Sequence, residues 1–98
     1  MKELTHNGRQ IEIRYHCFPE ALRGHLRGAC MIRNNRYVIL IDNKLPEEIQ
    51  RRTLGHELAH VFLGHLDSRK MKVNVAEFEA DMAEEEYMQR YAAGDLGD

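Results

Sequence analysis

The sequence contains no long hydrophobic run. No stretch of its 98 residues approaches the roughly eighteen consecutive apolar residues that a membrane-spanning helix requires, so we expect no membrane partner. The N-terminal segment, residues 1–6, also lacks the apolar core of a signal peptide. Together these two absences predict a cytoplasmic protein.

An excess of charge of one sign is also absent. Fourteen basic residues stand against sixteen acidic ones, which gives a net charge of −2. Domains that bind nucleic acid usually carry a basic patch or stripe. Here two groups of arginines, Arg23, Arg27, Arg33 and Arg36 and then Arg51 and Arg52, are spread among apolar and acidic neighbours in the sequence. We therefore expect a solvated surface and no direct binding of nucleic acid.

Cysteine is scarce. The chain has two cysteines, Cys17 and Cys30, and they lack the Cys-x-x-Cys spacing of a metal knuckle or a redox pair. In a reducing compartment such residues remain thiols, and we predict that both lie in or near the core. The alternatives are a regulatory disulfide and a second metal site that also uses His16.

Repeats, low-complexity tracts and linkers are absent as well. A chain of 98 residues suffices for one compact domain and is too short for two, so we expect a single domain over residues 1–98. The composition, 43% hydrophobic and 31% charged, is that of an ordinary globular domain. A domain of this size buries only a modest core, so a bound metal ion could be an additional source of stability.

The N-terminal half contains patterns typical of β-strands. Residues 10–15 alternate between polar and apolar, as in a half-buried strand. Two apolar runs, at 29–33 and 36–41, flank Asn34 and Asn35. Because asparagine tolerates the positive φ angles of a tight turn, we expect a β-hairpin there. A turn or a short helical stretch is expected over residues 18–24.

The C-terminal half predicts two helices. Pro46 is tolerated in the first turn of a helix, and the acidic Glu47 and Glu48 favour the helix dipole, so one helix is expected from there to about residue 64. A second helix is expected over residues 75–91. The order of strand, hairpin, helix and helix predicts an α+β fold, with a small antiparallel sheet and both helices packed on one side.

The first of these helices contains the motif His-Glu-x-x-His at residues 56–60. Residues i and i+4 lie on one helical face, so both imidazoles can bind one metal ion. Leu54, Leu58 and Val61 form an apolar stripe that can pack on the core while the histidines face a cleft. Glu57 points in a different direction, as a general base that acts on a metal-activated water must. The motif predicts an active-site helix of a zinc-dependent hydrolase.

A catalytic zinc ion requires a third protein ligand and an open position for water. The candidates are His65, Glu77 and Glu79. His65 would fall on the apolar stripe, and we interpret it as a helix-end residue that caps carbonyl groups. Glu77 and Glu79 point about 200° apart on a helix, so only one can face the cleft. Asp81 favours Glu77, because at i+4 it can accept the free N–H of a ligand imidazole.

These residues resemble the ImmA/IrrE family of zinc-dependent metallopeptidases. The resemblance covers roughly residues 28–83, and its most specific segments are 56–65 and 77–83. It implies a gluzincin-like site with Zn2+ as the cofactor. In such a site the zinc ligands would be His56, His60 and Glu77, with Glu57 as the general base and Asp81 behind a histidine. The implied partner is a protein or peptide substrate, and several family members promote cleavage of a DNA-binding repressor.

Two functions are consistent with this sequence. The first is hydrolysis of peptide bonds, with a regulatory or repressor protein as the substrate. The second is a non-catalytic zinc-binding module that binds a regulatory protein of a mobile element. Glu57 favours the first, because a structural zinc site needs no base and usually has four protein ligands.

For two features of catalysis, the oxyanion donor and the binding of an extended substrate, the sequence offers several alternatives. The donor that stabilises the oxyanion could be Tyr37, Tyr87, Tyr91 or a histidine. The strand over residues 37–41 could pair with an extended substrate if it lay at the edge of the sheet. A buried core strand is the alternative for that segment.

Overall fold

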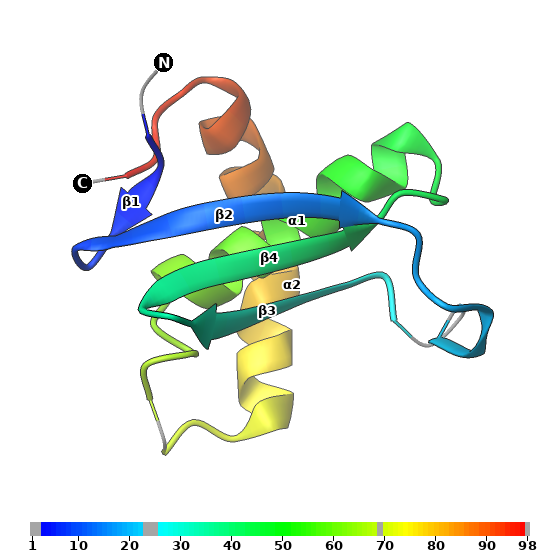
Figure 1. Cartoon of the computed structure of the whole chain (residues 1–98). Coiled ribbons are helices and arrows are strands. Elements are labelled where there is room, and N and C mark those ends of the chain that lie inside the picture. The colour runs from blue at the N-terminus through cyan, green and yellow to red at the C-terminus, as the bar shows by residue number, and fades with distance from the viewer. Residues whose placement is uncertain (1–2, 23–25, 69, 98) are drawn as a thin grey trace.

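The computed structural model describes residues 3–22, 26–68 and 70–97, which form an α+β fold (Figure 1). Four strands make one sheet in the order β1-β2-β4-β3. They are β1 (Thr5–His6), β2 (Arg9–His16), β3 (Gly28–Arg33) and β4 (Arg36–Asp42). The helices α1 (Glu47–Phe62) and α2 (Val73–Ala92) follow, so the predicted fold class is confirmed. Within the described residues, neither helix is long and apolar enough to cross a membrane.

The sheet is mixed. Strands β3 and β4 form the expected antiparallel hairpin, and Asn34 and Asn35 in its turn have φ angles of 52° and 61°. Strand β2 instead runs parallel to β4. The connection after β2 carries the chain across to the far side of β4 before β3 begins. This one pair of strands therefore departs from the antiparallel sheet that the sequence predicts.

The segment before residue 10 was not predicted to be a strand. Strand β1 pairs with the start of β2, and the turn between them contains Asn7 and Gly8 with φ angles of 54° and 73°. Asn-Gly is the strongest short-range signal of a hairpin, so the sequence did contain this information. The short helical stretch expected over 18–24 corresponds to the 3-10 helix η1 (Glu20–Leu22). Its expected end at Gly24, like Arg23, lies outside the described residues.

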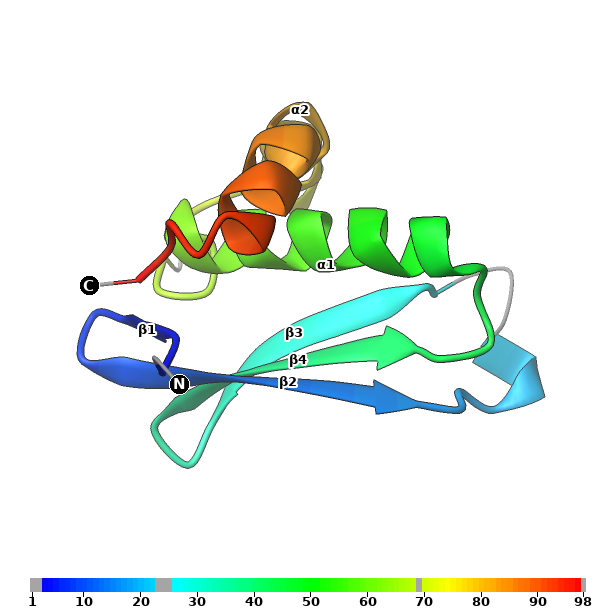
Figure 2. The ribbon, with the colours of Figure 1, turned by 90° about the horizontal axis from the view of Figure 1, so that it is seen from above.

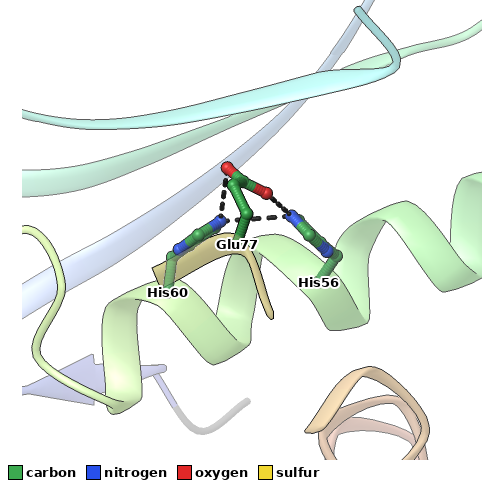
Figure 3. A group of neighbouring side chains, drawn as sticks. All are labelled: His56, His60 and Glu77. Carbon is green, nitrogen blue, oxygen red and sulfur yellow. Dashed lines mark hydrogen bonds and ion pairs between the residues drawn. The ribbon is translucent and has the colours of Figure 1, made fainter. Parts of the chain in front are cut away.

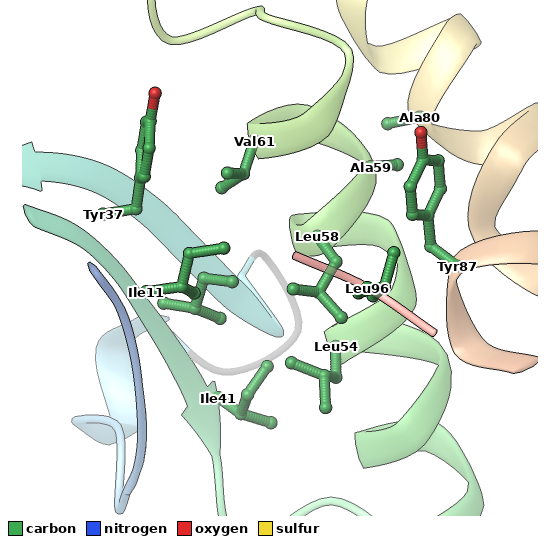
Figure 4. Close-up of a cluster of buried hydrophobic side chains, with 11 residues drawn as sticks. Ile11, Tyr37, Ile41, Leu54, Leu58, Ala59, Val61, Ala80, Tyr87 and Leu96 are labelled. Atoms are coloured by element: carbon green, nitrogen blue, oxygen red, sulfur yellow. The ribbon is translucent and has the colours of Figure 1, made fainter. Parts of the chain in front are cut away.

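Both helices lie on the same side of the sheet (Figure 2). Helix α1 lies over β3 and β4, and α2 packs against α1, farther from the sheet. The core fills the space between sheet and α1 (Figure 4), where Ile41 of β4 and Leu58 and Val61 of α1 are fully buried. Leu54 is also buried, which confirms the apolar stripe predicted on this helix.

Small residues allow the two helices to approach closely. Ala76 and Ala80 of α2 are buried. On α1, a Cβ added to Gly55 would collide with the backbone carbonyl oxygen of Glu84 and would lie 3.2 Å from the backbone nitrogen of Met88. The backbones of α1 and α2 therefore pack with no room for a side chain at this point, and this contact fixes α2 over the histidines of α1.

Strand β4 lies inside the sheet, between β2 and β3. The side chains of Tyr37, Ile39 and Ile41 are fully buried. The segment over residues 37–41 is therefore a core strand, and the suggestion that it forms an exposed edge is wrong. Strand β3, which also contacts α1, forms one edge of the sheet.

The two cysteines differ in their exposure. Cys30 on β3 is partly buried and packs against the core, as predicted. Cys17 is exposed, contrary to the prediction, because it directly follows the end of β2. Among the described residues, the groups of side chains that could hold a metal ion include neither cysteine.

Candidate metal centre

His56 and His60 extend from α1 toward the carboxylate of Glu77 on α2 (Figure 3). Their Nε2 atoms lie 3.1 Å apart. Glu77 places Oε2 2.8 Å from Nε2 of His56, and Oε1 3.2 Å from Nε2 of His60. Three side chains thus direct donor atoms at one small region of space.

This donor set fits a catalytic zinc ion. At ordinary zinc–nitrogen and zinc–oxygen bond lengths, the ligand atoms of a tetrahedral site lie about 3.3 Å apart. The separations of 2.8, 3.1 and 3.2 Å here are close to that value. A second group, His56 with Asp81 and Glu84, contains one imidazole only. The first group is the better zinc site, because two imidazoles and a carboxylate with one open position make up a known type of catalytic zinc site.

Asp81 contacts the other ring nitrogen of His56. Its Oδ1 lies 3.0 Å from Nδ1, while Nε2 of the same ring faces Glu77. A carboxylate at this position accepts a hydrogen bond from the Nδ1–H group and so leaves Nε2 unprotonated and free to bind a metal. This is the contact that the i, i+4 spacing of Glu77 and Asp81 suggests.

The remaining candidates for the third ligand, His65 and Glu79, lie beside His60. Nδ1 of His65 is 2.9 Å from Nδ1 of His60, and Nε2 of His65 is 2.7 Å from Oε1 of Glu79. Capping at this helix end is done by the backbone of His65, whose N–H donates to the carbonyl oxygen of His60 at 3.0 Å. The imidazole of His65 instead packs against the ring of His60.

Glu57 lies on the side of α1 that faces β3, and it is 6% exposed. Burial raises the pKa of its carboxyl group, whereas a hydrogen bond from the thiol of Cys30 and the nearby His56 act in the opposite direction. A carboxylate with a raised pKa is a stronger base, which suits it to take a proton from water. The thiol of Cys30 was not identified from the sequence as a neighbour of Glu57.

His56, Glu57, Glu77 and Asp81 line a cleft of about 490 Å³ between α1, α2 and the start of β3. Its lining residues are Leu26, Arg27, Gly28, Ile49, Arg52, Thr53, His56, Glu57, Glu77, Asp81 and Glu84. A larger hollow of about 680 Å³, beside β2 and the C-terminal segment, has no histidine or cysteine in its lining and so offers no comparable donor set. None of the tyrosines Tyr37, Tyr87 and Tyr91 lines the cleft, so none is placed to stabilise an oxyanion there.

Comparison with protein families agrees with this geometry. Residues 6–93 match the model of the IrrE N-terminal-like domain, Peptidase M78. The chain belongs to this family. The resemblance to ImmA/IrrE metallopeptidases is thereby confirmed, and the match extends well beyond residues 28–83 on which that resemblance rests. Comparisons of the chain with curated proteins and with solved structures gave no match.

Membership of the M78 family supports a metallopeptidase-like function and, at that general level, a protein or peptide substrate. Zinc is the metal generally associated with this family, and in this M78 domain His56, His60 and Glu77 could form the site. Burial lowers the pKa of the His60 imidazole, and the neighbouring histidines act in the same direction. A lowered pKa favours the neutral imidazole, which is the form that binds a metal.

Proposed function

We propose that this IrrE-like domain is a zinc-dependent metallopeptidase. The observation that carries the proposal is the convergence of His56, His60 and Glu77, with His56 and Glu77 lining a cleft that also contains the buried Glu57. Three ligands leave one position of a tetrahedral ion open to water, which distinguishes a catalytic zinc site from a structural one.

Each side chain has a defined task in this proposal. When bound, zinc supplies a Lewis acid that lowers the pKa of water toward neutrality and polarises a carbonyl group. Glu57 takes the proton of the attacking water and passes it to the leaving nitrogen as the peptide bond breaks. Asp81 accepts a hydrogen bond from Nδ1 of His56 and so holds that ring in place.

The edge strand β3 suggests where an extended substrate would lie. Gly28, at the start of β3, lines the cleft together with Glu57 and Glu77. A substrate segment that added to this edge by main-chain hydrogen bonds would pass in front of the general base. The substrate that we propose is a protein or peptide, with a cytoplasmic regulatory or repressor protein as the first class to test.

The substitution Glu57→Gln tests the enzymatic function. Zinc-loaded wild-type protein is expected to hydrolyse members of a mixed peptide library, and Glu57→Gln to do so about 10²- to 10⁴-fold more slowly, because the general base is lost. The variant should keep its zinc, since Glu57 is not a proposed ligand. Glu85→Gln, which removes an exposed carboxylate from α2, serves as the matched control.

Equal rates for wild type and Glu57→Gln would contradict this proposal. A zinc-loaded protein that cleaves no peptide, but binds a regulatory protein equally well with and without Glu57, would instead support the non-catalytic zinc-binding module. The two functions are therefore separated by one variant and two assays.

A further inference from the structure

The His65–Glu79 pair has no place in the proposed peptidase mechanism, although it touches the proposed zinc site. The side chain of His65 is only 4% exposed, whereas that of Glu79 is 45% exposed. His65 lies between two partners, with Nδ1 2.9 Å from Nδ1 of His60 and Nε2 2.7 Å from Oε1 of Glu79. The side chains of His60, His65 and Glu79 thus form a continuous row from the proposed zinc site to the surface.

The direction of the hydrogen bonds in this row follows from the role of His60. A histidine that binds a metal through Nε2 carries its proton on Nδ1, and this N–H requires an acceptor. Nδ1 of His65 can accept it only if the proton of His65 is on Nε2. Glu79 selects that tautomer, because its carboxylate is an acceptor placed at Nε2.

We propose that His65 and Glu79 are positioning residues that hold the imidazole of His60 in the tautomer and orientation required to bind zinc through Nε2. This inference rests on the proposed zinc site. The two histidines of the motif are then supported in different ways: His56 contacts a carboxylate directly, and His60 reaches one through a second imidazole. Glu77 and Glu79, both candidates for the third zinc ligand in the sequence, contact different histidines: Glu77 contacts His56 and His60, and Glu79 contacts His65.

The position of the pair agrees with a positioning role. A histidine whose side chain is almost fully buried needs partners for both ring nitrogens, and among the described residues the ring of His60 and the carboxylate of Glu79 supply them for His65. Any rotation of the His65 ring would break one of these contacts. The His60 ring is therefore fixed by packing as well as by hydrogen bonding.

Zinc affinity of matched variants tests this inference. Asparagine at position 65 places an amide oxygen near the position of the histidine Nδ1, whereas leucine has nearly the same shape and no acceptor. We expect His65→Leu to bind zinc about 10- to 100-fold more weakly than wild type, and His65→Asn to recover most of that loss. Glu79→Ala should weaken binding in the same direction, and Glu85→Ala on the same helix should not.

Two measurements separate positioning from a purely structural role. Competition with a chromophoric zinc chelator gives the affinity, and nitrogen-15 NMR of the zinc-loaded protein reports which ring nitrogen of His60 carries the proton. Thermal unfolding of the metal-free variants shows whether each remains folded. Because Glu79 is half-exposed, Glu79→Ala should fold normally even if His65→Leu does not.

The outcomes are distinct. Weaker zinc binding by His65→Leu and Glu79→Ala, with recovery in His65→Asn, supports the inference. Wild-type affinity in folded His65→Leu and Glu79→Ala overturns it and leaves the proposed peptidase intact. A wild-type protein that binds no zinc overturns the proposed function and this inference together.

Discussion

The thiol of Cys30 lies beside the carboxyl group of Glu57, and these two side chains face each other between the edge strand β3 and helix α1 beside the cleft. The two elements are tightly packed at the same place. A Cβ added to Gly28 would lie 2.6 Å from Cγ2 of Thr53 and 3.5 Å from Cγ of Glu57, both on α1. The proposed general base and the proposed substrate-binding edge are thus held in a fixed relation by side-chain contacts.

The first prediction concerns the reactivity of Cys30. Burial raises the pKa of the Cys30 thiol, and the neighbouring Glu57 carboxylate adds to the effect, so the reactive thiolate is scarce at neutral pH. In a Cys17→Ser background, we expect Cys30 to react with a disulfide reagent far more slowly in the native protein than after unfolding in guanidinium. Equally fast reaction in both states would show that the thiol is not buried against Glu57.

The second prediction concerns metal content. After mild dialysis, wild-type protein is expected to hold about one zinc ion per chain, because three ligand atoms converge on one position. His60→Ala and Glu77→Ala should lose the metal, and Glu85→Ala should retain it. Elemental analysis measures the number of zinc ions per chain in wild type and in the three variants. Zinc retained in full by Glu77→Ala would remove that residue from the ligand set.

The third prediction concerns the contact between the helices. Gly55→Ala introduces a methyl group where the Glu84 carbonyl oxygen and the Met88 backbone nitrogen already lie, and backbone atoms cannot move aside as a flexible side chain can. We expect a loss of about 1–3 kcal/mol in the free energy of unfolding, despite the higher helix propensity of alanine.

Urea denaturation measures this loss. Arg51→Ala, at an exposed position on the same helix, is the control and should change stability little. Because α2 carries Glu77, Gly55→Ala should also bind zinc more weakly. Unaltered stability in Gly55→Ala would mean that the two helices are less closely packed than this structure shows.

The fourth prediction concerns pH-dependent stability at Asp67. Its carboxylate accepts hydrogen bonds from the hydroxyl of Tyr37 at 2.6 Å and from Arg9 at 2.7 Å, and these contacts lower the pKa of Asp67 below 3.8. A lowered folded-state pKa stabilises the protein above the unfolded-state pKa, and the stabilisation is lost as the pH falls through the folded-state value.

Asp67→Asn should therefore reduce the free energy of unfolding by about 1 kcal/mol at pH 6, a modest amount because the pair is partly exposed to solvent. The difference from wild type should shrink below pH 3.8. Urea denaturation at a series of pH values measures it, with Glu85→Gln as a control. A difference that stays constant down to pH 2.5 would contradict the assignment.

Local patterns in the sequence were sufficient to predict much of the fold and the candidate site. The His56–His60 spacing and the apolar stripe of α1 are properties of one helix, and the Glu77–Asp81 spacing is a property of the other. The turn at Asn34 and Asn35 is equally local, since it depends on two residues that tolerate positive φ. Such features depend on neighbours within a few positions, so tertiary packing changed them little.

The features that could not be predicted depend on contacts between distant segments. The parallel pairing of β2 with β4 requires a crossover that no short pattern encodes. The proximity of Cys30 to Glu57 involves residues 27 positions apart in sequence, on elements of different type. His65 lies just past the end of α1, where the chain leaves the helix, so helical periodicity no longer gave its direction correctly.

Zinc would act on this chain as a cross-link. Two of the three donor side chains belong to α1 and the third to α2, so one ion would join helices that otherwise contact each other through packing and a few polar side-chain contacts. By mass action, free zinc at a thousand times its dissociation constant would add about 4 kcal/mol to the apparent stability. The resistance of the protein to unfolding, and hence to degradation by proteases, would then rise and fall with the zinc supply.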